Sequence, residues 1–347
     1  LLNNNTRFNV SVIVRRRNVD KCFSAKEFND TFKYFKSKNY KTISAQDLNN
    51  TNDYDILFYL DPANLAEKQI NLFNIPLNVM VLHTSYSFML AGNKEKIKLW
   101  MYHLSYKYYT DSVYYKNEVS KYKLYTGNAE FLGFPKMDQY YLTDCKKTTN
   151  KKVIIYAPHH SVNYKKFKSA TFEDNFLFIL ELAKKYNKDT FWIYKPHPLL
   201  RDHSVEAGIF KSTDDYDNYV KQWNTLENAK VASSGDYYSF FKESDAMITD
   251  SVSFLAEYQF THKPLLLLQS GVEEYNDFGQ SIVNILYKCN GKDFNSIENF
   301  IIDCINEKDD MYEERMSFFD NNLEYINDGE MANKRIYDQI IEFTERL

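Results

Sequence analysis

Short apolar runs alternate with helix-like segments along the chain, and this alternation constrains the fold more than any other feature. The runs are rich in β-branched, aliphatic and aromatic residues and occupy residues 9–14, 55–60, 78–83, 152–158, 190–196, 246–250 and 264–268. Between them, apolar residues recur at the three- and four-residue spacing of amphipathic helices at 26–37, 172–186 and 239–246. Continuous apolar strands joined by helices are typical of parallel sheets that helices cover on both faces. The sequence therefore predicts an α/β protein.

The length of the chain and one polar segment predict two domains. At 347 residues the chain exceeds the usual size of a single hydrophobic core. The segment LTDCKKTTNKK at 142–152 separates the strand–helix units before it from those after it, so we expect domains at 1–145 and 146–347. Residues 296–347 read as two or three helices, and the pattern does not decide whether the last one packs on the first domain. A cleft between two domains is the default place for a ligand.

The composition excludes several classes of protein. A formal net charge of -4 gives no support for general nucleic-acid binding, which requires a strongly basic domain. No apolar run approaches the roughly 18–20 residues that cross a bilayer, and the start LLNNNTRFN lacks the order of a signal peptide. The cysteines form no C-x-x-C pair and indicate neither a zinc site nor a disulfide framework: they are Cys22, Cys145, Cys289 and Cys304. We therefore expect a cytoplasmic protein with reduced thiols.

Polar side chains gather where strands of the second half end. Proline cannot continue a strand ladder, so the residues that follow it leave the sheet. Because the carboxyl ends of parallel strands meet at one edge, where such sheets bind ligands, we expect these residues to lie close together. They come from the stretches YAPHHS (156–161), YKPHP (194–198) and ITDSVSFLAEY (248–258), and include His159, His160, Ser161, His197, Ser251 and Ser253.

Two of these stretches have the chemistry to hold a phosphate. Thr249, Asp250 and Ser251 stand at the start of an expected helix, where they can cap the helix or help to bind an anion. Neither G-x-G-x-x-G nor G-x-x-x-x-G-K-[ST] occurs, which disfavours a glycine-rich phosphate loop. Lys195 and Arg201 flank the histidine of YKPHP and can pair with a diphosphate, or they are ordinary surface charges.

A lysine- and tyrosine-rich segment at 94–125 allows two interpretations. Such a surface attracts a polyanion or anionic lipid heads. Alternatively, it is a helix with packed aromatic residues and solvated lysines.

Six stretches, in order, resemble the CDP-glycerol glycerophosphotransferase family, whose members build teichoic-acid-like polyol phosphate chains. They are LGFPKMD (132–138), IIYAPHHS (154–161), YKPHP (194–198), SDAMITDSVSFLAEY (244–258), KPLLLL (263–268) and INDGEMANKRI (326–336). The resemblance covers the chain from about residue 127 onward. The family's Trp-His-Gly histidine has its nearest counterpart in His83 of VLHTSYS, which lacks the tryptophan and the glycine.

The resemblance implies a GT-B architecture, with two Rossmann-like domains facing across a cleft and C-terminal helices. It implies attack of an acceptor hydroxyl on the β-phosphorus of CDP-glycerol, with release of CMP. In this reaction His83 is the candidate base, and His197 steadies the diphosphate. Ser251 and Ser253 bind phosphate oxygens.

The remaining site residues follow from the same resemblance. His159, His160 and Ser161 replace the residues that usually follow Ala-Pro in the family, and we expect them to contact donor or acceptor phosphate. Glu257 reaches a ribose hydroxyl if it faces the cleft; otherwise it occupies an exposed helix position. We expect no metal and no other cofactor.

The expected partners are a CDP-activated donor and a polysaccharide or lipid-linked acceptor of a capsule or teichoic-acid type. Peripheral association with the inner face of the membrane is a further expectation. Two rival functions share the fold. One is a GT-B glycosyltransferase that uses a nucleotide sugar or another CDP-activated donor, and the other is a non-catalytic module that binds the polymer.

Overall fold

The computed structural model of the protein forms two compact units. It describes residues 2–15, 21–48, 50–60, 75–91, 103, 105–122, 126–162, 169–232, 237–326 and 328–345. The first unit comprises Leu1–Tyr86, Ile97–Phe134 and Tyr325–Leu347, and the second comprises Ser87–Lys96 and Pro135–Glu324. No helix in the described part of the chain is both long enough and apolar enough to span a bilayer.

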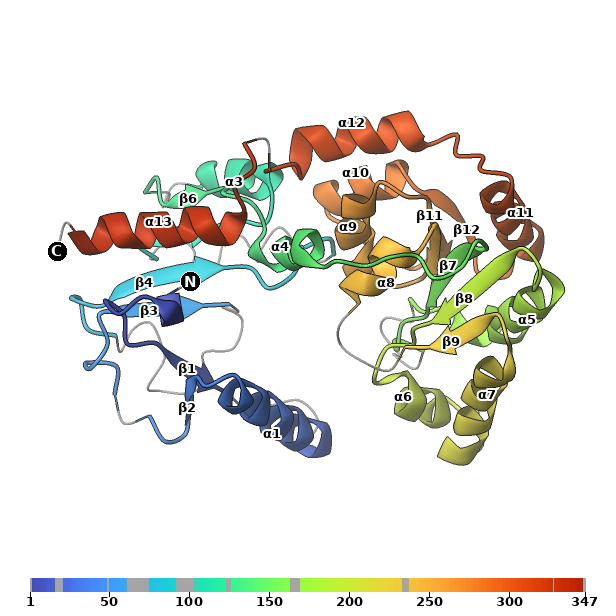
Figure 1. Ribbon diagram of the computed structural model, residues 1–347, viewed down its shortest axis with the longest axis horizontal. Coiled ribbons are helices and arrows are strands. Elements are labelled where there is room, and N and C mark those ends of the chain that lie inside the picture. Colours follow the sequence, from blue (N-terminus) through green and yellow to red (C-terminus); the bar gives the residue numbers. More distant parts are fainter. Residues whose placement is uncertain are drawn as a thin grey trace. The chain divides into compact units, whose positions relative to one another are not determined.

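A six-stranded parallel sheet forms the centre of the second unit (Figure 1). Its strand order is β12-β11-β10-β7-β8-β9. Read from β9, this is the 3-2-1-4-5-6 order of a Rossmann fold. Strands β8 and β9 are added on one side of β7 and strands β10 to β12 on its other side, so the strand order reverses between β7 and β10. The strands are β7 (Lys152–Ala157), β8 (Thr190–Tyr194), β9 (Ala229–Val231), β10 (Ala246–Thr249), β11 (Leu265–Gln269) and β12 (Tyr287–Asn290).

Helices cover this sheet because successive side chains of each strand point to opposite faces. Ile154 and Tyr156 of β7 enter a core built with four of the helices, α5, α6, α7 and α11. Val153 and Ile155 of the same strand are equally buried and face the opposite side. The helices are α4 (Pro135–Leu142), α5 (Phe172–Lys185), α6 (Leu200–Glu206), α7 (Thr213–Thr225), α8 (Tyr238–Glu243), α9 (Val252–Glu257), α10 (Asp277–Asn284), α11 (Phe294–Ile305) and α12 (Tyr312–Asn322).

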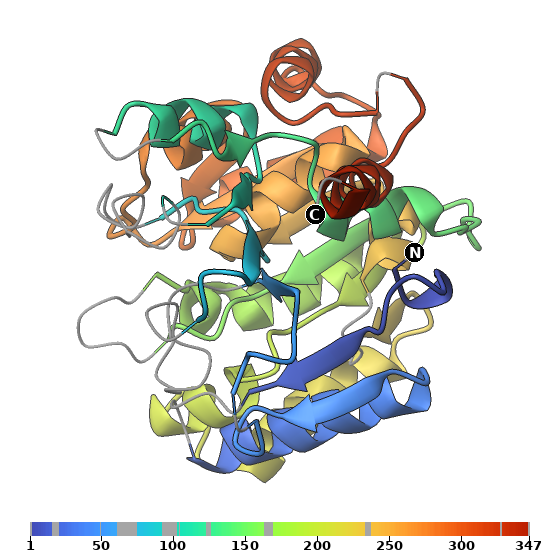
Figure 2. The same cartoon turned by 90° about the vertical axis from the view of Figure 1, so that its left-hand side faces the viewer.

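The described part of the first unit contains two separate parallel sheets. A pair, β1 (Ser11–Val14) and β2 (Lys41–Ser44), packs against helix α1 (Lys21–Ser37) (Figure 2). A four-stranded sheet has the order β3-β4-β5-β6. Its strands are β3 (Ile56–Tyr59), β4 (Met80–Thr84), β5 (Lys107–Tyr109) and β6 (Ala129–Glu130), and helix α3 (Val113–Ser120) lies between the last two in the chain.

The last helix, α13 (Ala332–Glu345), belongs to the first unit. Its Ile336, Ile340 and Phe343 pack with Leu82 of β4 and Tyr109 of β5. The three helices α11, α12 and α13 confirm the prediction of two or three helices after residue 296. The packing of α13 decides a question that the sequence pattern left open.

The compact units divide the chain at other positions than the predicted 1–145 and 146–347. The division falls at Phe134/Pro135, because α4 packs on α8 of the second unit, where the Tyr238 hydroxyl donates to the Lys136 carbonyl at 2.9 Å. It falls again at Tyr325, because α13 completes the core of the first unit.

All of the predicted strands and helices are present, most within two residues of the predicted bounds, although α1 begins five residues earlier than predicted and α8 ends three residues earlier. Five strands were not predicted: β2, β5, β6, β9 and β12. They are short and carry polar residues, as in KTIS for β2 and YKCN for β12, so that no apolar run marks them.

The lysine- and tyrosine-rich segment at 94–125 is not one helix. Residues 94–102, 104 and 123–125 lie outside the described residues. The described part contains β5 and α3, and Tyr108, Tyr109 and Tyr115 are buried in it. Lys107 pairs with Glu130 at 2.9 Å. These tyrosines are therefore core residues of the first unit.

Candidate active site

The candidate site lies at the carboxyl edge of the six-stranded sheet, where the strand order reverses between β7 and β10. His159, His160 and Ser161 follow β7, and His197 follows the neighbouring strand β8. The loops after β7 and β8 are joined, because the His197 backbone N–H donates to the Pro158 carbonyl at 3.1 Å. Ligands of doubly wound sheets bind at this position. The structure thus brings together four of the residues that the sequence placed at strand ends, His159, His160, Ser161 and His197.

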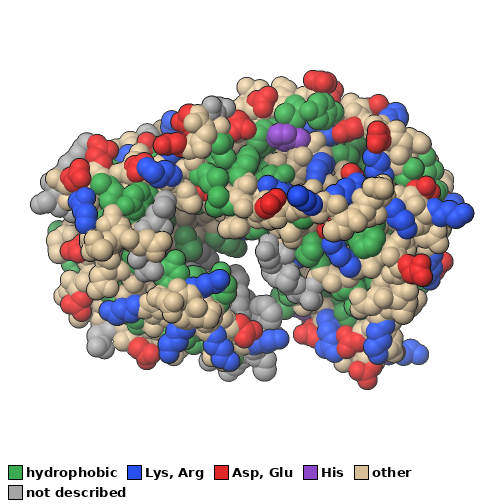
Figure 3. Space-filling model, in the orientation of Figure 1, with side chains coloured by type: hydrophobic (Ala, Val, Ile, Leu, Met, Phe, Trp, Pro, Cys, Tyr) green, Lys and Arg blue, Asp and Glu red, His purple; other side chains and the backbone are tan. Residues whose placement is uncertain are grey.

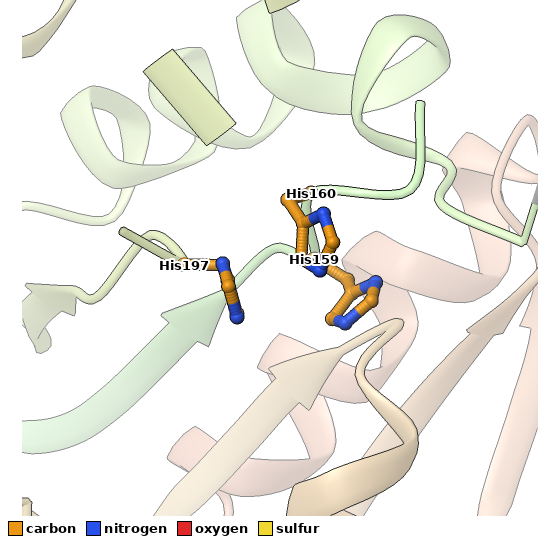
Figure 4. A group of neighbouring side chains, drawn as sticks. All are labelled: His159, His160 and His197. Carbon is orange, nitrogen blue, oxygen red and sulfur yellow. The ribbon is translucent and has the colours of Figure 1, made fainter. Parts of the chain in front are cut away.

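Three histidine rings form a cluster at this edge (Figure 4). The ring centres of His160 lie 4.3 Å from His159 and 4.1 Å from His197, and those of His159 and His197 are 5.2 Å apart. One ring nitrogen from each lies within 4.8 Å of the other two. All three side chains are half-buried. The sequence predicted each residue as a phosphate contact, but it did not predict that their rings would touch.

Hydrogen bonds orient each ring. The Leu199 backbone N–H donates to His197 Nδ1 at 3.1 Å, so the neutral ring of His197 carries its proton on Nε2. His159 Nδ1 lies 2.9 Å from the hydroxyl of Ser161, which in turn lies 2.7 Å from the hydroxyl of Ser169. His160 Nδ1 lies 3.1 Å from Nδ1 of His203 on α6.

The three rings are uncharged at neutral pH. Burial, reinforced by the neighbouring histidines, lowers the pKa of His159 to about 3 and that of His197 to about 3. For His160, burial and His203 lower the pKa to about 4. Neutral imidazoles offer one N–H donor and one nitrogen lone pair each, and no fixed positive charge.

Asp250 holds the loop after β7 in place. Its carboxylate accepts from the backbone N–H groups of His159 and Thr171, each at 2.6 Å, and from the Thr171 hydroxyl at 3.2 Å. Burial raises the pKa of Asp250 to about 6 despite these bonds. The Thr249 hydroxyl donates to the Ala157 carbonyl at 2.7 Å, across the strand pair β7–β10. Asp250 and Thr249 were predicted to contact the nucleotide donor. In the structure they make hydrogen bonds within the protein that position the histidines.

Lys195, the first residue after β8, is a buried cation. It is 9% exposed, and burial lowers its pKa. Its ammonium lies 5.7 Å from the ring centres of both Tyr237 and Phe254. Among the residues that the structure describes, no carboxylate forms an ion pair with it. Aromatic faces stabilise a cation but leave its charge unneutralised, so Lys195 can still attract an anion.

Glu257, predicted as a ribose contact or an exposed residue, is bound inside the second unit. It is 1% exposed and forms an ion pair with Lys136 of α4 at 2.7 Å. The hydroxyl of Tyr237 also donates to it. The alternative of an exposed helix position is therefore wrong. The pair joins two of the motifs seen in the sequence, LGFPKMD and TDSVSFLAE, into one structural unit.

The other predicted contacts have different surroundings. Arg201 forms a two-point hydrogen bond with Asp217 of α7, at 2.8 and 2.7 Å, so its guanidinium fork is already occupied. Ser251 is buried at the start of α9, and its backbone N–H donates to the Thr249 hydroxyl at 3.0 Å. Its own hydroxyl makes no capping bond. Ser253 is exposed.

His83 belongs to the other unit. It is the fourth residue of β4, buried beside Tyr108 of β5, and the two rings meet edge to face at 5.2 Å. Burial lowers the pKa of His83 to about 3, which makes it a weak base in this environment. Its predicted role as the catalytic base stays a prediction.

Sequence reasoning missed four residues around the site: Lys136, His203, Tyr237 and Phe254. Lys136 stands in LGFPKMD, one of the six stretches of the family resemblance, to which no site role was assigned, and His203 follows KPHP by five residues. Tyr237 and Phe254 carried no sequence signal, because aromatic residues are 17% of the chain. On the face shown in Figure 3, basic and acidic side chains are interspersed over the described surface. No single sign of charge dominates this described face.

The fold and the site define a two-unit α/β protein of the GT-B type. The wall teichoic acid polymerase TagF shares the fold with a TM-score of 0.58 at 15% identity, over 98% of this chain and 90% of that one. A UDP-GlcNAc 2-epimerase from Neisseria meningitidis, bound to UDP-GlcNAc, gives 0.60 at 14% identity, over 98% and 94%. S. aureus MnaA with UDP gives 0.54 at 16% identity, over 95% and 83%.

The sequence model of the CDP-glycerol:poly(glycerophosphate) glycerophosphotransferase family matches residues 74–342. The chain belongs to this family and is a glycerophosphotransferase-like enzyme. A comparison with curated proteins by sequence finds no significant match. The match to the family model confirms the family predicted from the motifs.

Proposed function

We propose that the protein transfers a glycerol phosphate or related polyol phosphate unit from CDP-glycerol to an acceptor hydroxyl, and that CMP is released. The acceptor is a surface polysaccharide, a capsule polymer or a teichoic-acid-like chain. The family match supports a CDP-glycerol type of donor. The observation that carries the proposal is Lys195, a buried ammonium that pairs with no carboxylate among the described residues and lies at the edge where such a sheet binds nucleotides.

The charge of the donor explains why this lysine matters. A diphosphate carries its negative charge on oxygens that need cations or N–H donors once water is excluded. Lys195 supplies the cation. His197, whose proton is held on Nε2 by the bond from Leu199, supplies a neutral N–H donor. Ser251 adds a hydroxyl that makes no capping bond.

The reaction forms one bond and breaks one. The acceptor oxygen attacks the β-phosphorus, the bond from that phosphorus to the bridging oxygen breaks, and CMP leaves with the bonding electrons. The acceptor proton passes to a base, for which His83 is the predicted residue. Charge on the oxygens of the transferred group is the part of the transition state that a site of this kind stabilises.

Ligand binding and a lysine variant test the proposal together. We expect CMP and CDP-glycerol to raise the melting temperature, and UDP, UDP-sugars and GDP to have little effect. Lys195→Met should weaken CDP-glycerol binding about 10- to 150-fold, the range for a hydrogen bond to a charged group. Lys184→Met, which removes an exposed lysine of the same unit, is the matched control.

The outcomes separate the rival functions. Selective stabilisation by UDP ligands would move the protein to the nucleotide-sugar transferases. Polymer binding without CMP release from any donor would favour the non-catalytic module. Equal CDP-glycerol affinity of the wild type and Lys195→Met would remove Lys195 from the site. A lipid-linked acceptor would bring the protein to the inner face of the membrane, which sedimentation with acceptor-containing vesicles tests.

A further inference from the structure

The histidine cluster has the composition of a transition-metal site. His159 and His160 come from one loop and His197 from the next, and one nitrogen of each lies within 4.8 Å of the other two. No carboxylate among the described residues belongs to this group. Imidazole nitrogens suit Zn²⁺, Ni²⁺, Cu²⁺ and Fe²⁺, whereas Mg²⁺, Ca²⁺ and Mn²⁺ prefer oxygen ligands.

From this geometry we propose that His159, His160 and His197 together bind one divalent transition-metal ion, with Zn²⁺ as the best match. Three histidines leave one position of a tetrahedral ion open, as in sites where zinc acts on a substrate. Zn–N bonds of about 2.0–2.1 Å place ligand nitrogens about 3.3 Å apart, so the rings must approach by an ångström or so. Figure 4 shows the three rings facing one another from their two loops, and half-buried side chains can make this adjustment.

The hydrogen bonds around the rings determine what the ion must displace. If His159 Nδ1 carries the proton, it donates to the Ser161 hydroxyl at 2.9 Å and Ser161 donates to Ser169, whereas the 3.3 Å bond from the Ser161 backbone N–H to the same Nδ1 is lost. This chain leaves His159 Nε2 for the ion, with the outer-shell support that metal-bound histidines usually have. A metal on His197 Nε2 would shift the ring's proton to Nδ1, which breaks the bond from the Leu199 N–H, and the ion would then replace the Nε2–H of His197 as the group that contacts the donor diphosphate. Each of these neutral hydrogen bonds is a small loss beside a nitrogen–metal bond.

The ion would add to the positive charge of this edge, and Lys195 would repel it until an anion binds. Three neutral imidazoles leave a bound Zn²⁺ with its full charge of two, and Lys195 adds a further positive charge. The open position would then take an anionic oxygen. On the proposed function, that oxygen belongs to the donor diphosphate, and only this contact with the diphosphate rests on the proposed function.

Metal binding by the full chain tests the inference directly. The protein is stripped with EDTA, the chelator is removed, and Co²⁺ is titrated while visible absorption is recorded. We expect one Co²⁺ per chain, with the intense bands of a tetrahedral site, and displacement of Co²⁺ by one equivalent of Zn²⁺. His160→Ala and the more conservative His160→Gln should each weaken binding about 100-fold or more, above the loss typical of outer-shell changes. His262→Ala, which changes a histidine of the same unit outside the cluster, should bind like the wild type.

Several results would overturn the inference. These are the absence of one-to-one binding by the wild type, equal affinity in both His160 variants, and a loss of binding in His262→Ala. Fluorescence of the buried Trp192 and Trp223 reports whether each variant is folded. CDP-glycerol binding is measured with and without EDTA. If CDP-glycerol binds in EDTA and the metal titration fails, the proposed function stands and the metal site is refuted. If one metal ion binds but CDP-glycerol does not bind with or without EDTA, the metal site stands and the proposed function is refuted.

Discussion

Replacing Lys136 with methionine removes the cation that balances Glu257 inside the second unit. The Glu257 side chain is 1% exposed, and its carboxylate lies 2.7 Å from the Lys136 ammonium. Breaking a buried ion pair leaves an uncompensated buried charge and costs about 3–5 kcal/mol. Because the Lys136 side chain is itself 34% exposed, solvent partly screens the pair, and we expect a loss of about 3 kcal/mol, at the lower end.

Urea unfolding measures this loss. With slopes of about 1–3 kcal/mol per molar urea, a loss of 3 kcal/mol lowers the midpoint by about 1 M or more. Two of the three tryptophans, Trp192 and Trp223, are buried in the second unit, so tryptophan fluorescence follows mainly the unit that contains the pair. Lys184→Met is the control, because the Lys184–Glu181 pair is exposed and should contribute less than about 1 kcal/mol.

A double variant separates the charge from the packing. Lys136→Met combined with Glu257→Met removes both charges, so its cost should fall below the sum of the single variants by about 2 kcal/mol or more. A cost of Lys136→Met below about 0.5 kcal/mol would mean that the pair behaves like an exposed one. Strict additivity of the two substitutions would equally refute the reasoning.

Three further predictions concern the site and its support. His197→Ala should lower kcat for CMP release from CDP-glycerol about 100- to 1000-fold, the effect of removing one hydrogen-bond donor to the charge that develops in the transition state. Tryptophan fluorescence should be unchanged, and near-normal turnover would exclude the assigned role. Because burial raises the pKa of Asp250 from 3.8 to about 6, the folded state binds this proton more tightly than the unfolded state. The wild type should therefore lose roughly 3 kcal/mol of stability relative to Asp250→Asn as pH rises from about 4 to about 6.5, and parallel pH profiles would contradict this. Gly279→Ala would place a Cβ 2.1 Å from the Leu90 carbonyl oxygen and should cost about 1–3 kcal/mol in urea unfolding, whereas Gln280→Ala on the exposed side of α10 should be neutral.

Gly133 shows how far a motif can be interpreted without a structure. In LGFPKMD the glycine predicts only a bend. In the structure its φ is +102°, and a Cβ would lie 2.4 Å from the ring of Tyr325. Tyr325 is far from Gly133 in the chain, so no local pattern could show that these two residues lie against each other. The same holds for Lys136, whose partner Glu257 stands in another motif.

The sequence alone determined the α/β class, the parallel strands with apolar runs, the family and the strand ends that carry the polar residues. These properties are local, since consecutive apolar residues mark a buried strand and a proline directly after them marks its end. It also supplied His159, His160 and His197 as separate candidates.

Only the tertiary structure decided which candidates have partners inside the protein and which remain available. Glu257 and Arg201 form ion pairs with Lys136 and Asp217, and Asp250 accepts bonds from the loop after β7, whereas Lys195 is left with aromatic neighbours. Such pairings join residues from different elements, and their strength depends on burial. A linear sequence records neither quantity, because distance and solvent exclusion arise only when the sheet and its helices pack.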